Sequence, residues 1–272
     1  MKKTFNTIIQ FFELMVFVIK VILRTDFKNH LKYQNHNREL MILANGPSLN
    51  NVLQQLDLFS YDYSVVNDFF KSPYYSIIKP KYHVLADPLY FTEEEYLNTI
   101  IDVVKWEMIL LVPYNAYKKN HILRNMSNRY IVVRPFHLIE YKGFEKLRNV
   151  LYKSGLAMPR SQNVVVASIY TAINMGYKTI KLYGVDHSWT ESIRVNENNQ
   201  VCQVDAHFYD TEKVKLAPWH KTSGEVYKMS EILRDLAQMF DSYDILRKYA
   251  DYMKCKVINN TKGSFIDAFE RS

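Results

Sequence analysis

Residues 41–49 of this chain are Met41-Ile42-Leu43-Ala44-Asn45-Gly46-Pro47-Ser48-Leu49, and they decide its fold. The apolar run at the start is typical of a buried strand, and the Asn-Gly-Pro-Ser sequence ends such a strand in a tight turn. Apolar residues then recur at helical spacing, at Leu49, Val52, Leu53 and Leu56. The stretch therefore predicts a strand, a turn and the start of a helix.

The predicted turn has the features of a phosphate site. The first amides of a helix have no intrahelical partner, and the peptide dipoles add roughly half a positive charge there. Gly46 lets backbone approach a ligand closely, and Pro47 fits the first helical turn, where its missing amide hydrogen costs nothing. We expect Asn45, Gly46, Pro47 and Ser48 to bind a phosphate; the alternative is a strand-helix corner in which Asn45 or Ser48 only caps the helix.

Short apolar runs alternate with helical patterns along the rest of the chain. The expected strands cover residues 39–44, 63–67, 82–86, 107–112, 130–133, 179–183 and 256–258. The clearest helical patterns cover residues 92–104, 163–175 and 225–253, the last with a break expected near 241–243. Short apolar strands that alternate with helices are typical of a parallel sheet covered on both faces. We therefore predict an α/β fold with a single, mostly parallel, Rossmann-like sheet.

The composition is that of a folded protein with one sizeable core, since the 272 residues are 48% hydrophobic and 23% charged. The net charge of +7 comes from basic residues scattered along the chain. No nucleic-acid partner is therefore predicted, and anionic substrates or an anionic membrane surface are expected. Cys202 and Cys255 are far apart without a metal-binding spacing, so we expect free thiols.

The N-terminal segment forms a unit of its own. Residues 1–24 have basic residues at both ends of a long apolar stretch that Glu13 and Lys20 interrupt. No signal cleavage site follows, and the apolar run is marginal for the roughly 20 residues that a membrane span needs. We expect an amphipathic helix on an anionic membrane surface; packing on the core or on a partner is the alternative. Residues 1–38 are predicted as this helix and a linker, and residues 39–272 as the catalytic domain.

Residues 187–223 do not fit the alternation of strands and helices. The segment is polar and aromatic and carries three of the eight histidines. A segment of this length inside a compact domain is usually a functional lid or disordered, and the aromatic content argues against disorder. We predict a lid in which His207 or His220 serves as general base; a surface or packing role is the alternative for each.

Polar residues follow the expected strands where ligands bind in open α/β sheets. Asn67 follows the second strand and is expected to bond a ribose or base edge, and Asp87 follows the third as a candidate for a metal, a ribose hydroxyl or an acceptor. A turn or a helix cap is the alternative for both. Asp186 is a candidate functional carboxylate, and Gly184 would let ligand or lid backbone approach it.

A second candidate phosphate site lies at the start of the helix expected over residues 163–175. Ser161 or Asn163 would cap this helix, and its first amides together with Arg160 would bind an anion. A capped helix with a surface arginine is the alternative. The chain has no HExxH motif, cysteine pair, GxSxG elbow or P-loop lysine, so no metal site is predicted.

Four of these segments together resemble a known superfamily. They are the NGPSL turn, the strand that ends at Asn67, residues 79–87 and residues 163–189. They are similar to the bacterial sialyltransferases of surface glycans and to the broader MptE-like domain family, which includes an archaeal hydroxymethylpterin pyrophosphokinase. The resemblance covers about residues 39–269 and implies a GT-A-like variant of the Rossmann fold with a lid.

The resemblance also implies roles for single residues. Asn45, Gly46 and Ser48 match a turn beside the donor phosphate, and Asn67 matches an asparagine that contacts the nucleotide. Residues 160–163 are similar, but not identical, to an Arg-x-Thr-Ser turn of the sialyltransferases.

Two further matches and one departure concern the chemistry itself. Gly184 and Asp186 match the family's glycine-hydrophobic-aspartate strand end. The tyrosine that braces the leaving phosphate in the family is replaced by the sequence His187-Ser188-Trp189, a departure that disfavours a cytidine-sialic-acid donor. His220 matches the family's histidine base by position, with His207 as its rival.

These observations predict a membrane-associated glycosyltransferase. It would move a sugar from a CMP- or UDP-linked donor to a capsule, lipopolysaccharide or lipid-linked glycan, while helix termini and lysines neutralise the departing phosphate. His207, His220 or Asp186 would take the acceptor proton. The resemblance implies inversion without a required cofactor, while Asp87 and Asp186 leave Mg²⁺ or Mn²⁺ open.

The expected location is the cytoplasmic face of the inner membrane, and a homo-oligomer is left open. Two alternatives remain: a Mg²⁺-dependent pyrophosphokinase that uses ATP, and a non-catalytic scaffold in glycan assembly.

Overall fold

The computed structural model describes residues 2–25, 36–204, 206–210, 215–221 and 223–272. Each of the seven expected strands is present, with ends that shift by a few residues. They are β1 (Glu39–Leu43), β2 (Tyr61–Val66), β3 (Tyr82–Val84), β4 (Met108–Pro113), β5 (Ile131–Phe136), β6 (Thr179–Tyr183) and β10 (Lys256–Asn259).

These strands form one sheet in the order β10-β6-β1-β2-β3-β4-β5, and all the pairings between neighbours are parallel. The chain starts in the interior of the sheet at β1, runs outward through β5 and returns to the other side of β1 with β6. This reversal is a topological switch point, where ligands bind in open parallel sheets. The predicted α/β class and parallel sheet are confirmed.

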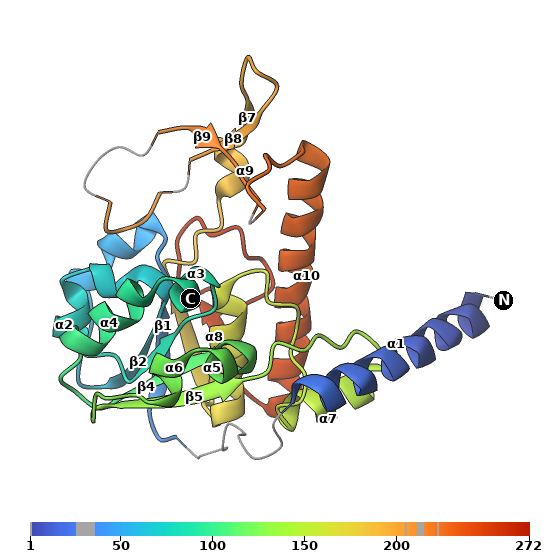
Figure 1. The fold of residues 1–272 in the computed structure, drawn as a ribbon, viewed down its shortest axis with the longest axis horizontal. Helices are drawn as coiled ribbons and strands as arrows, with labels where there is room; N and C mark the ends of the chain where they lie inside the picture. The colour runs from blue at the N-terminus through green and yellow to red at the C-terminus, as the bar shows by residue number, and fades with distance from the viewer. Residues whose placement is uncertain (1, 26–35, 205, 211–214, 222) are drawn as a thin grey trace.

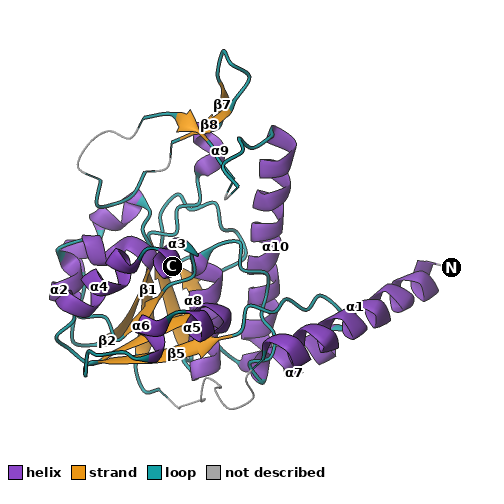
Figure 2. Ribbon diagram, viewed as in Figure 1, coloured by secondary structure: helices purple, strands orange, loops and turns teal. Residues whose placement is uncertain are grey.

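Helices cover both faces of the sheet, and β1 contributes to both cores. Leu40 and Ile42 belong to one apolar cluster, and Met41 and Leu43 belong to the other, because successive side chains of a strand point to opposite faces. The helices over the first cluster are α8 (Val164–Met175) and α10 (Met229–Met253); those over the second include α2 (Tyr74–Ile78) and α4 (Glu94–Val103) (Figure 2).

The stretch after β1 differs from the expected helix. It forms two 3₁₀ turns, η1 (Pro47–Asn51) and η2 (Leu53–Gln55). The Asn50 side chain in this stretch donates to the Phe208 carbonyl (2.9 Å), 158 positions further along the chain, so the turn is held by a long-range contact. The predicted position of the helix start was therefore correct, but the predicted α-helix is replaced by 3₁₀ turns.

The long C-terminal helix is continuous. The pattern predicted a helix over residues 225–253 with a break near 241–243, but α10 begins at Met229 and runs unbroken to Met253. Ser242 lies within the helix, where its hydroxyl donates to the Gln238 carbonyl one turn earlier (2.8 Å) and to the Arg160 carbonyl (2.9 Å). The expected break is wrong.

The segment over residues 187–223 has a small structure of its own, beyond the end of β6 (Figure 1). It contains α9 (Trp189–Ser192) and an antiparallel sheet of β7 (Arg194–Val195), β8 (Val201–Gln203) and β9 (Ala217–Pro218). Strands this short carry no measurable periodicity, so the sequence did not predict them. Residues 205, 211–214 and 222 of the expected lid lie outside the described residues.

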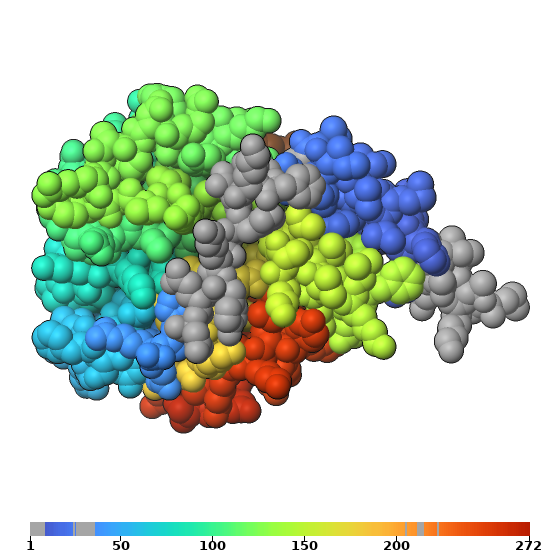
Figure 3. Space-filling view, turned by 90° about the horizontal axis from the view of Figure 1, so that it is seen from below, coloured from blue at the N-terminus to red at the C-terminus, as the bar shows by residue number. Residues whose placement is uncertain are grey.

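The expected N-terminal helix is present as α1 (Lys2–Arg24). Phe17 and Val21 are buried on the body of the protein, where the Phe17 and Tyr141 rings lie 5.0 Å apart. The space-filling view shows α1 in blue, projecting from the body (Figure 3). Within the described ranges, no helix combines the length and apolarity needed to cross a membrane. Most of the expected linker, residues 26–35, lies outside the described residues.

The remaining helices are short connections. They are η3 (Asn67–Lys71), α3 (Leu89–Thr92), α5 (Tyr114–Lys119), α6 (His121–Arg124) and α7 (Glu145–Lys153).

Candidate functional site

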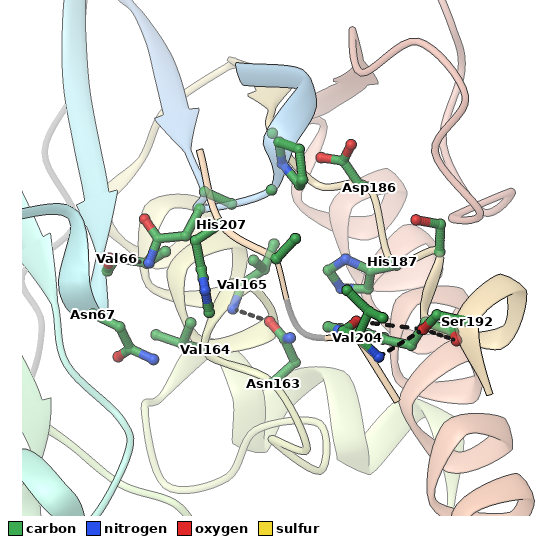
Figure 4. A pocket seen from close by; sticks show the side chains of 18 of the residues that line it. Val66, Asn67, Asn163, Val164, Val165, Asp186, His187, Ser192, Val204 and His207 are labelled. Carbon is green, nitrogen blue, oxygen red and sulfur yellow. Dashed lines mark hydrogen bonds between the residues drawn. The ribbon is translucent and has the colours of Figure 1, made fainter. Parts of the chain in front are cut away.

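One pocket opens at the carboxyl ends of β1, β2 and β6, the strands around the switch point (Figure 4). Its volume is about 360 Å³, and its wall combines the β1 turn, the starts of η3 and α8, and the segment that follows β6. The predicted site residues that it brings together are Asn45, Gly46, Pro47, Asn67, Asn163, Gly184, Asp186 and His207. The order of strands in the sheet, rather than distance along the chain, unites them.

The amides of the β1 turn are already bonded within the protein, contrary to the expectation that they are free. The Gly46 N–H donates to the Gly184 carbonyl (2.9 Å), and the Leu49 N–H donates to the Gly46 carbonyl (3.1 Å). Ser48 donates to the Asp186 carboxylate through its amide (3.2 Å) and its hydroxyl (2.8 Å). The Asp186 carboxylate thus accepts the hydrogen bonds that the sequence had assigned to a phosphate, and it ties the turn to the end of β6.

Glycine is required at two positions of this junction. A Cβ atom on Gly46 would lie 1.9 Å from Oδ2 of Asp186 and 2.5 Å from the Gly184 carbonyl oxygen. Gly184 adopts a φ of +68°, and a Cβ atom there would lie 2.8 Å from the Ala44 carbonyl oxygen. A side chain at either position would force the ends of β1 and β6 apart.

The N-terminus of α8 faces the pocket. Asn163 caps this helix, since its Oδ1 accepts a hydrogen bond from the Val165 N–H (2.7 Å), drawn as a dashed line in Figure 4. Val164 is the first helical residue, so its amide has no intrahelical acceptor, and both valines line the pocket. The helix dipole adds roughly half a positive charge at this point. The second predicted phosphate site therefore opens onto the pocket at Asn163.

Two asparagines add polar groups to the wall. Asn45 donates through Nδ2 to the Val66 carbonyl (3.2 Å), while its Oδ1 is buried without a partner in the described part of the chain. An orphaned buried acceptor is costly unless a ligand donates to it. Asn67 has a φ of +44°, and its Oδ1 accepts a hydrogen bond from the Ala86 N–H (3.3 Å).

The lid is attached to the pocket rim at Phe208. The Phe208 N–H donates to the Asn45 carbonyl (3.0 Å), and its carbonyl accepts from the Asn50 side chain (2.9 Å). The Phe208 ring is buried beside that of Phe69, with 5.0 Å between centroids. Both the backbone and the side chain of Phe208 therefore fix this part of the lid to the ends of β1 and β2.

This attachment places His207 in the pocket wall, where Figure 4 shows its ring beside the space that Asn67 and Asn163 also face. The ring stacks on Tyr209 at 5.1 Å, and its Nδ1 lies 3.7 Å from Oδ2 of Asp210. The Asp210 carboxylate is a neighbouring negative charge on the Nδ1 side, beyond hydrogen-bond distance, and it also accepts a hydrogen bond from the His207 backbone N–H (2.6 Å).

A second histidine in the wall is buried. The Nε2 of His187 lies 2.7 Å from the hydroxyl of Tyr243 on α10, and burial lowers the pKa of His187 to about 3. His83, behind the pocket, is also buried, and burial lowers its pKa to about 4. The Nε2–H of His83 donates to the Asn67 carbonyl (2.8 Å), and its Nδ1 accepts from the Tyr75 hydroxyl (2.9 Å). Both rings are therefore neutral in the folded protein at neutral pH.

Because the pKa values of these two histidines are lowered in the fold, we expect the protein to lose stability in acid. Both histidines have a pKa below 6.5 in the folded protein. At a pH between the folded and the unfolded pKa, such a histidine binds a proton in the unfolded chain but not in the folded one. Its contribution to stability is complete above about pH 6.5 and is lost as the pH falls toward the folded pKa. We expect urea titrations at pH 7 and pH 5 to differ by roughly 2 kcal/mol of unfolding free energy for each histidine.

The matched variant for this prediction is His83→Gln, because glutamine also offers a donor and an acceptor. Between pH 7 and pH 5, the variant should lose about half as much unfolding free energy as the wild type loses. A loss of unfolding free energy equal to that of the wild type would contradict the assignment of a neutral His83.

Five predicted site residues lie outside the pocket wall: Ser48, Asp87, Arg160, Ser161 and His220. Asp87 follows β3, which β2 separates from β1, so it lies away from the switch point. Its carboxylate accepts a hydrogen bond from the Leu89 N–H two residues later (2.9 Å), which forms a turn just before α3, whose N-cap position is Pro88. His220 is exposed in the lid, with its Nδ1 2.9 Å from the Gly224 carbonyl oxygen.

The second predicted phosphate turn is divided between two places. Asn163 lines the pocket, whereas Arg160 and Ser161 line a separate hollow beside Lys20 of α1. The Ser161 hydroxyl donates to the Asn163 carbonyl (3.2 Å), and the Asn163 side chain is the helix cap. An arginine and a helix N-terminus acting together on one anion are therefore not seen here.

The charged side chains of the pocket wall include two carboxylates, Asp186 and Glu191. No lysine or arginine belongs to the wall within the described residues, so the expected lysines beside the phosphate are not found there. In the same part of the chain, no group of three or more His, Cys, Asp or Glu residues is placed to hold a metal ion.

The wall also contains residues that the sequence analysis did not predict as site residues, although it noted His187, Ser188 and Trp189 as a departure from the family. They come from the segment after Asp186 and from the end of β8, and they are His187, Ser188, Trp189, Glu191, Ser192 and Val204. The Ser192 hydroxyl ties the two parts together, because it donates to the Val204 carbonyl (3.3 Å) and accepts from the Val204 N–H (3.2 Å). The signal in the sequence for the first five is their position directly after the strand end at Asp186, and Val204, which follows β8, has no such signal.

Comparison with known proteins gives a family match in sequence. The family described as 6-hydroxymethylpterin diphosphokinase MptE-like has a sequence model that matches residues 15–192, more than half of the chain. Comparison with the curated proteins gives no match.

Solved structures with a similar fold include the sialyltransferase CstII from Campylobacter jejuni in complex with cytidine-5'-monophosphate. The sequence identity is 15%, the alignment covers 88% of this chain and 86% of that chain, and the TM-score is 0.48. The MAf glycosyltransferase from Magnetospirillum magneticum AMB-1 is 12% identical, with 90% of this chain and 36% of that chain covered and a TM-score of 0.49. An apo α-2,3-sialyltransferase from Campylobacter jejuni is 16% identical, with coverages of 90% and 83% and a TM-score of 0.47.

Proposed function

Because this chain belongs to the 6-hydroxymethylpterin diphosphokinase MptE-like family, we propose that its pocket binds a phosphorylated nucleotide. More narrowly, we propose a glycosyltransferase that moves a sugar from a CMP- or UDP-linked donor to a hydroxyl group of a surface glycan or glycolipid. The observation that carries this proposal is the meeting of the α8 N-terminus, Asn45 and the lid residue His207 in one pocket.

The phosphate and the nucleoside of the donor each have a matching group in the pocket. The donor phosphate would lie at the N-terminus of α8, where the Val164 amide and the helix dipole favour an anion. The orphaned Oδ1 of Asn45 would accept a hydrogen bond from a ribose hydroxyl or a base amine, and Asn67 lies at the neighbouring strand end.

The charges of the wall favour a donor with few phosphates. Asp186 and Glu191 line the pocket, and two carboxylates repel a polyanion such as ATP more strongly than a sugar linked to a single phosphate. The helix dipole offsets only about half a charge. This balance supports sugar transfer over diphosphate transfer, and CMP over UDP as the leaving nucleotide.

The proposed step uses groups of the chain itself. The acceptor hydroxyl oxygen attacks the anomeric carbon of the donor sugar, and a new C–O bond forms. The bond between that carbon and the phosphate oxygen breaks, its electron pair stays on the phosphate, and Nε2 of His207 takes the hydroxyl proton. The α8 N-terminus stabilises the charge that develops on the phosphate. Attack from the face opposite the phosphate inverts the sugar, and the step as written uses no metal ion.

In this scheme Asp186 and His220 lose their place as candidate bases. The Asp186 carboxylate accepts two hydrogen bonds from Ser48 and holds the turn, and His220 lies outside the wall. We therefore assign the base to His207.

The family description favours a second candidate, a Mg²⁺-dependent enzyme that transfers diphosphate from ATP to a hydroxymethyl compound. A thermal-shift screen separates the two candidates, with CMP sugars, UDP sugars and ATP each tested with and without Mg²⁺. Sugar transfer predicts that a nucleotide sugar raises the melting temperature without Mg²⁺. A shift confined to ATP with Mg²⁺ would overturn sugar transfer in favour of the kinase.

A further inference from the structure

The outer side of α1 is apolar and exposed. Eight large apolar side chains on this helix are exposed, out of nineteen in the described part of the chain. We call them the outer apolar face, and they are Ile9, Phe11, Phe12, Met15, Val18, Ile19, Ile22 and Leu23. With about 100° of rotation per residue, they cover about half of the helix circumference.

The opposite side of α1 is already packed on the protein. Phe17 and Val21 are buried in the apolar cluster that α8 and α10 cover, and Leu14 packs against it. The Phe11 ring meets that of Phe144 edge-on at 5.4 Å. The contact with the body therefore accounts for one side of the helix and for Phe11 at the edge of the outer apolar face, and it leaves the rest of that face exposed in the described part of the chain.

The charges around this face match an anionic surface. In sequence, residues 1–24 carry Lys2, Lys3, Lys20 and Arg24 against the single acid Glu13. The exposed Lys20 also lines a hollow of about 280 Å³ beside the helix, together with Arg160 and Glu140. Basic residues next to an apolar face are typical of a helix that lies among lipid headgroups.

The width of the face favours lipid over another helix. A partner helix in a coiled coil covers a narrow seam in which apolar residues repeat about every 3.5 positions. The outer apolar face is about half a circumference wide, so a lipid surface would cover it far more completely.

We propose that the outer apolar face of α1 docks on an anionic lipid bilayer, with the helix parallel to the membrane plane. Phe12, Met15, Ile19 and Ile22 enter the boundary between headgroups and acyl chains, and Lys20 and Arg160 lie at the level of the lipid phosphates. This docking is independent of the proposed sugar transfer. It would also hold the pocket near a membrane-bound acceptor.

The test is flotation of the full chain with vesicles of phosphatidylcholine alone or with one third phosphatidylglycerol. We expect binding to the anionic vesicles that high salt weakens. The variant Phe12→Ser/Ile19→Ser/Ile22→Ser should bind at least about tenfold more weakly, because it removes three large apolar groups from the lipid contact. The matched control is Phe59→Ser/Leu233→Ser, which changes exposed apolar residues elsewhere and should bind as the wild type does.

Three results would overturn the proposal. They are a wild-type chain that stays unbound with both kinds of vesicle, a triple variant that binds as well as the wild type, and a wild-type dimer that the triple variant disperses while vesicle binding is absent. The last result would assign the face to a second copy of the chain. Circular dichroism of the variants shows that they are folded, and none of these readouts depends on enzymatic activity.

Discussion

Replacement of His207 by glutamine is expected to lower the rate of sugar transfer about 10²–10⁴-fold, the range that a positioned general base contributes. Glutamine is close in size to histidine but does not take up a proton at neutral pH. Donor binding should persist, because the α8 N-terminus and Asn45 are untouched. The measurement is release of free nucleotide from the donor in the presence of acceptor, together with the donor concentration at half-maximal rate.

The matched control is His220→Gln, at the exposed lid histidine outside the pocket wall. It should leave the rate unchanged. An equal loss in both variants, or full activity of the His207 variant, would show that the base is another group.

The second large effect is expected at Gly46. A Cβ atom there would lie 1.9 Å from Oδ2 of Asp186 and 2.5 Å from the Gly184 carbonyl oxygen, so Gly46→Ala must move the β1 turn away from β6. We expect a loss of roughly 1–3 kcal/mol in unfolding free energy, as for other overpacked sites. Nucleotide binding should also be lost, because the turn forms one wall of the pocket. Urea titration and calorimetric titration measure the two effects.

Pro47→Ala is the control for this variant, since Pro47 is the next residue and is exposed. Pro47→Ala should lower the unfolding free energy by no more than about 1 kcal/mol, because alanine gives the unfolded chain more freedom and changes the turn only slightly. A Gly46→Ala protein as stable as the wild type, with its nucleotide binding intact, would contradict the packing of the junction described above.

Much of the fold could be predicted because its strands are short apolar runs with clear ends. The run from Met41 to Ala44 and the turn at Gly46 mark a buried strand without any knowledge of its neighbours. The Asn163 cap could also be predicted, because a capping side chain acts within its own helix. The 3₁₀ turns after β1 could not, since Asn50 bonds a residue 158 positions away.

The candidate site could be predicted only as a set of strand ends. Asn67 and Asp87 each follow a strand and look equivalent in sequence, yet only Asn67 lines the pocket. The difference comes from the order of strands, which places β2 beside β1 and β3 one strand further out. Local patterns define where a strand ends but not which strands are neighbours.

The internal partner of the β1 turn could not be predicted from the sequence either. Ser48 and Asp186 are 138 positions apart, and nothing in the turn sequence shows that a carboxylate of the chain accepts its hydrogen bonds. For this reason we propose that the phosphate lies at the N-terminus of α8 and not at the turn. The contact of His187 could not be predicted for a similar reason, because its partner, Tyr243 of α10, is 56 positions away.

The most direct test of a nucleotide phosphate at the α8 N-terminus is calorimetric titration of the best-binding nucleotide sugar into the wild type and Asn163→Asp. Aspartate caps a helix as well as asparagine does, so stability should be unchanged. Its added negative charge beside the phosphate is expected to weaken binding at least about tenfold, since repulsion at this range exceeds about 1.4 kcal/mol. Equal affinity of the two proteins, at equal stability, would contradict a phosphate in this pocket.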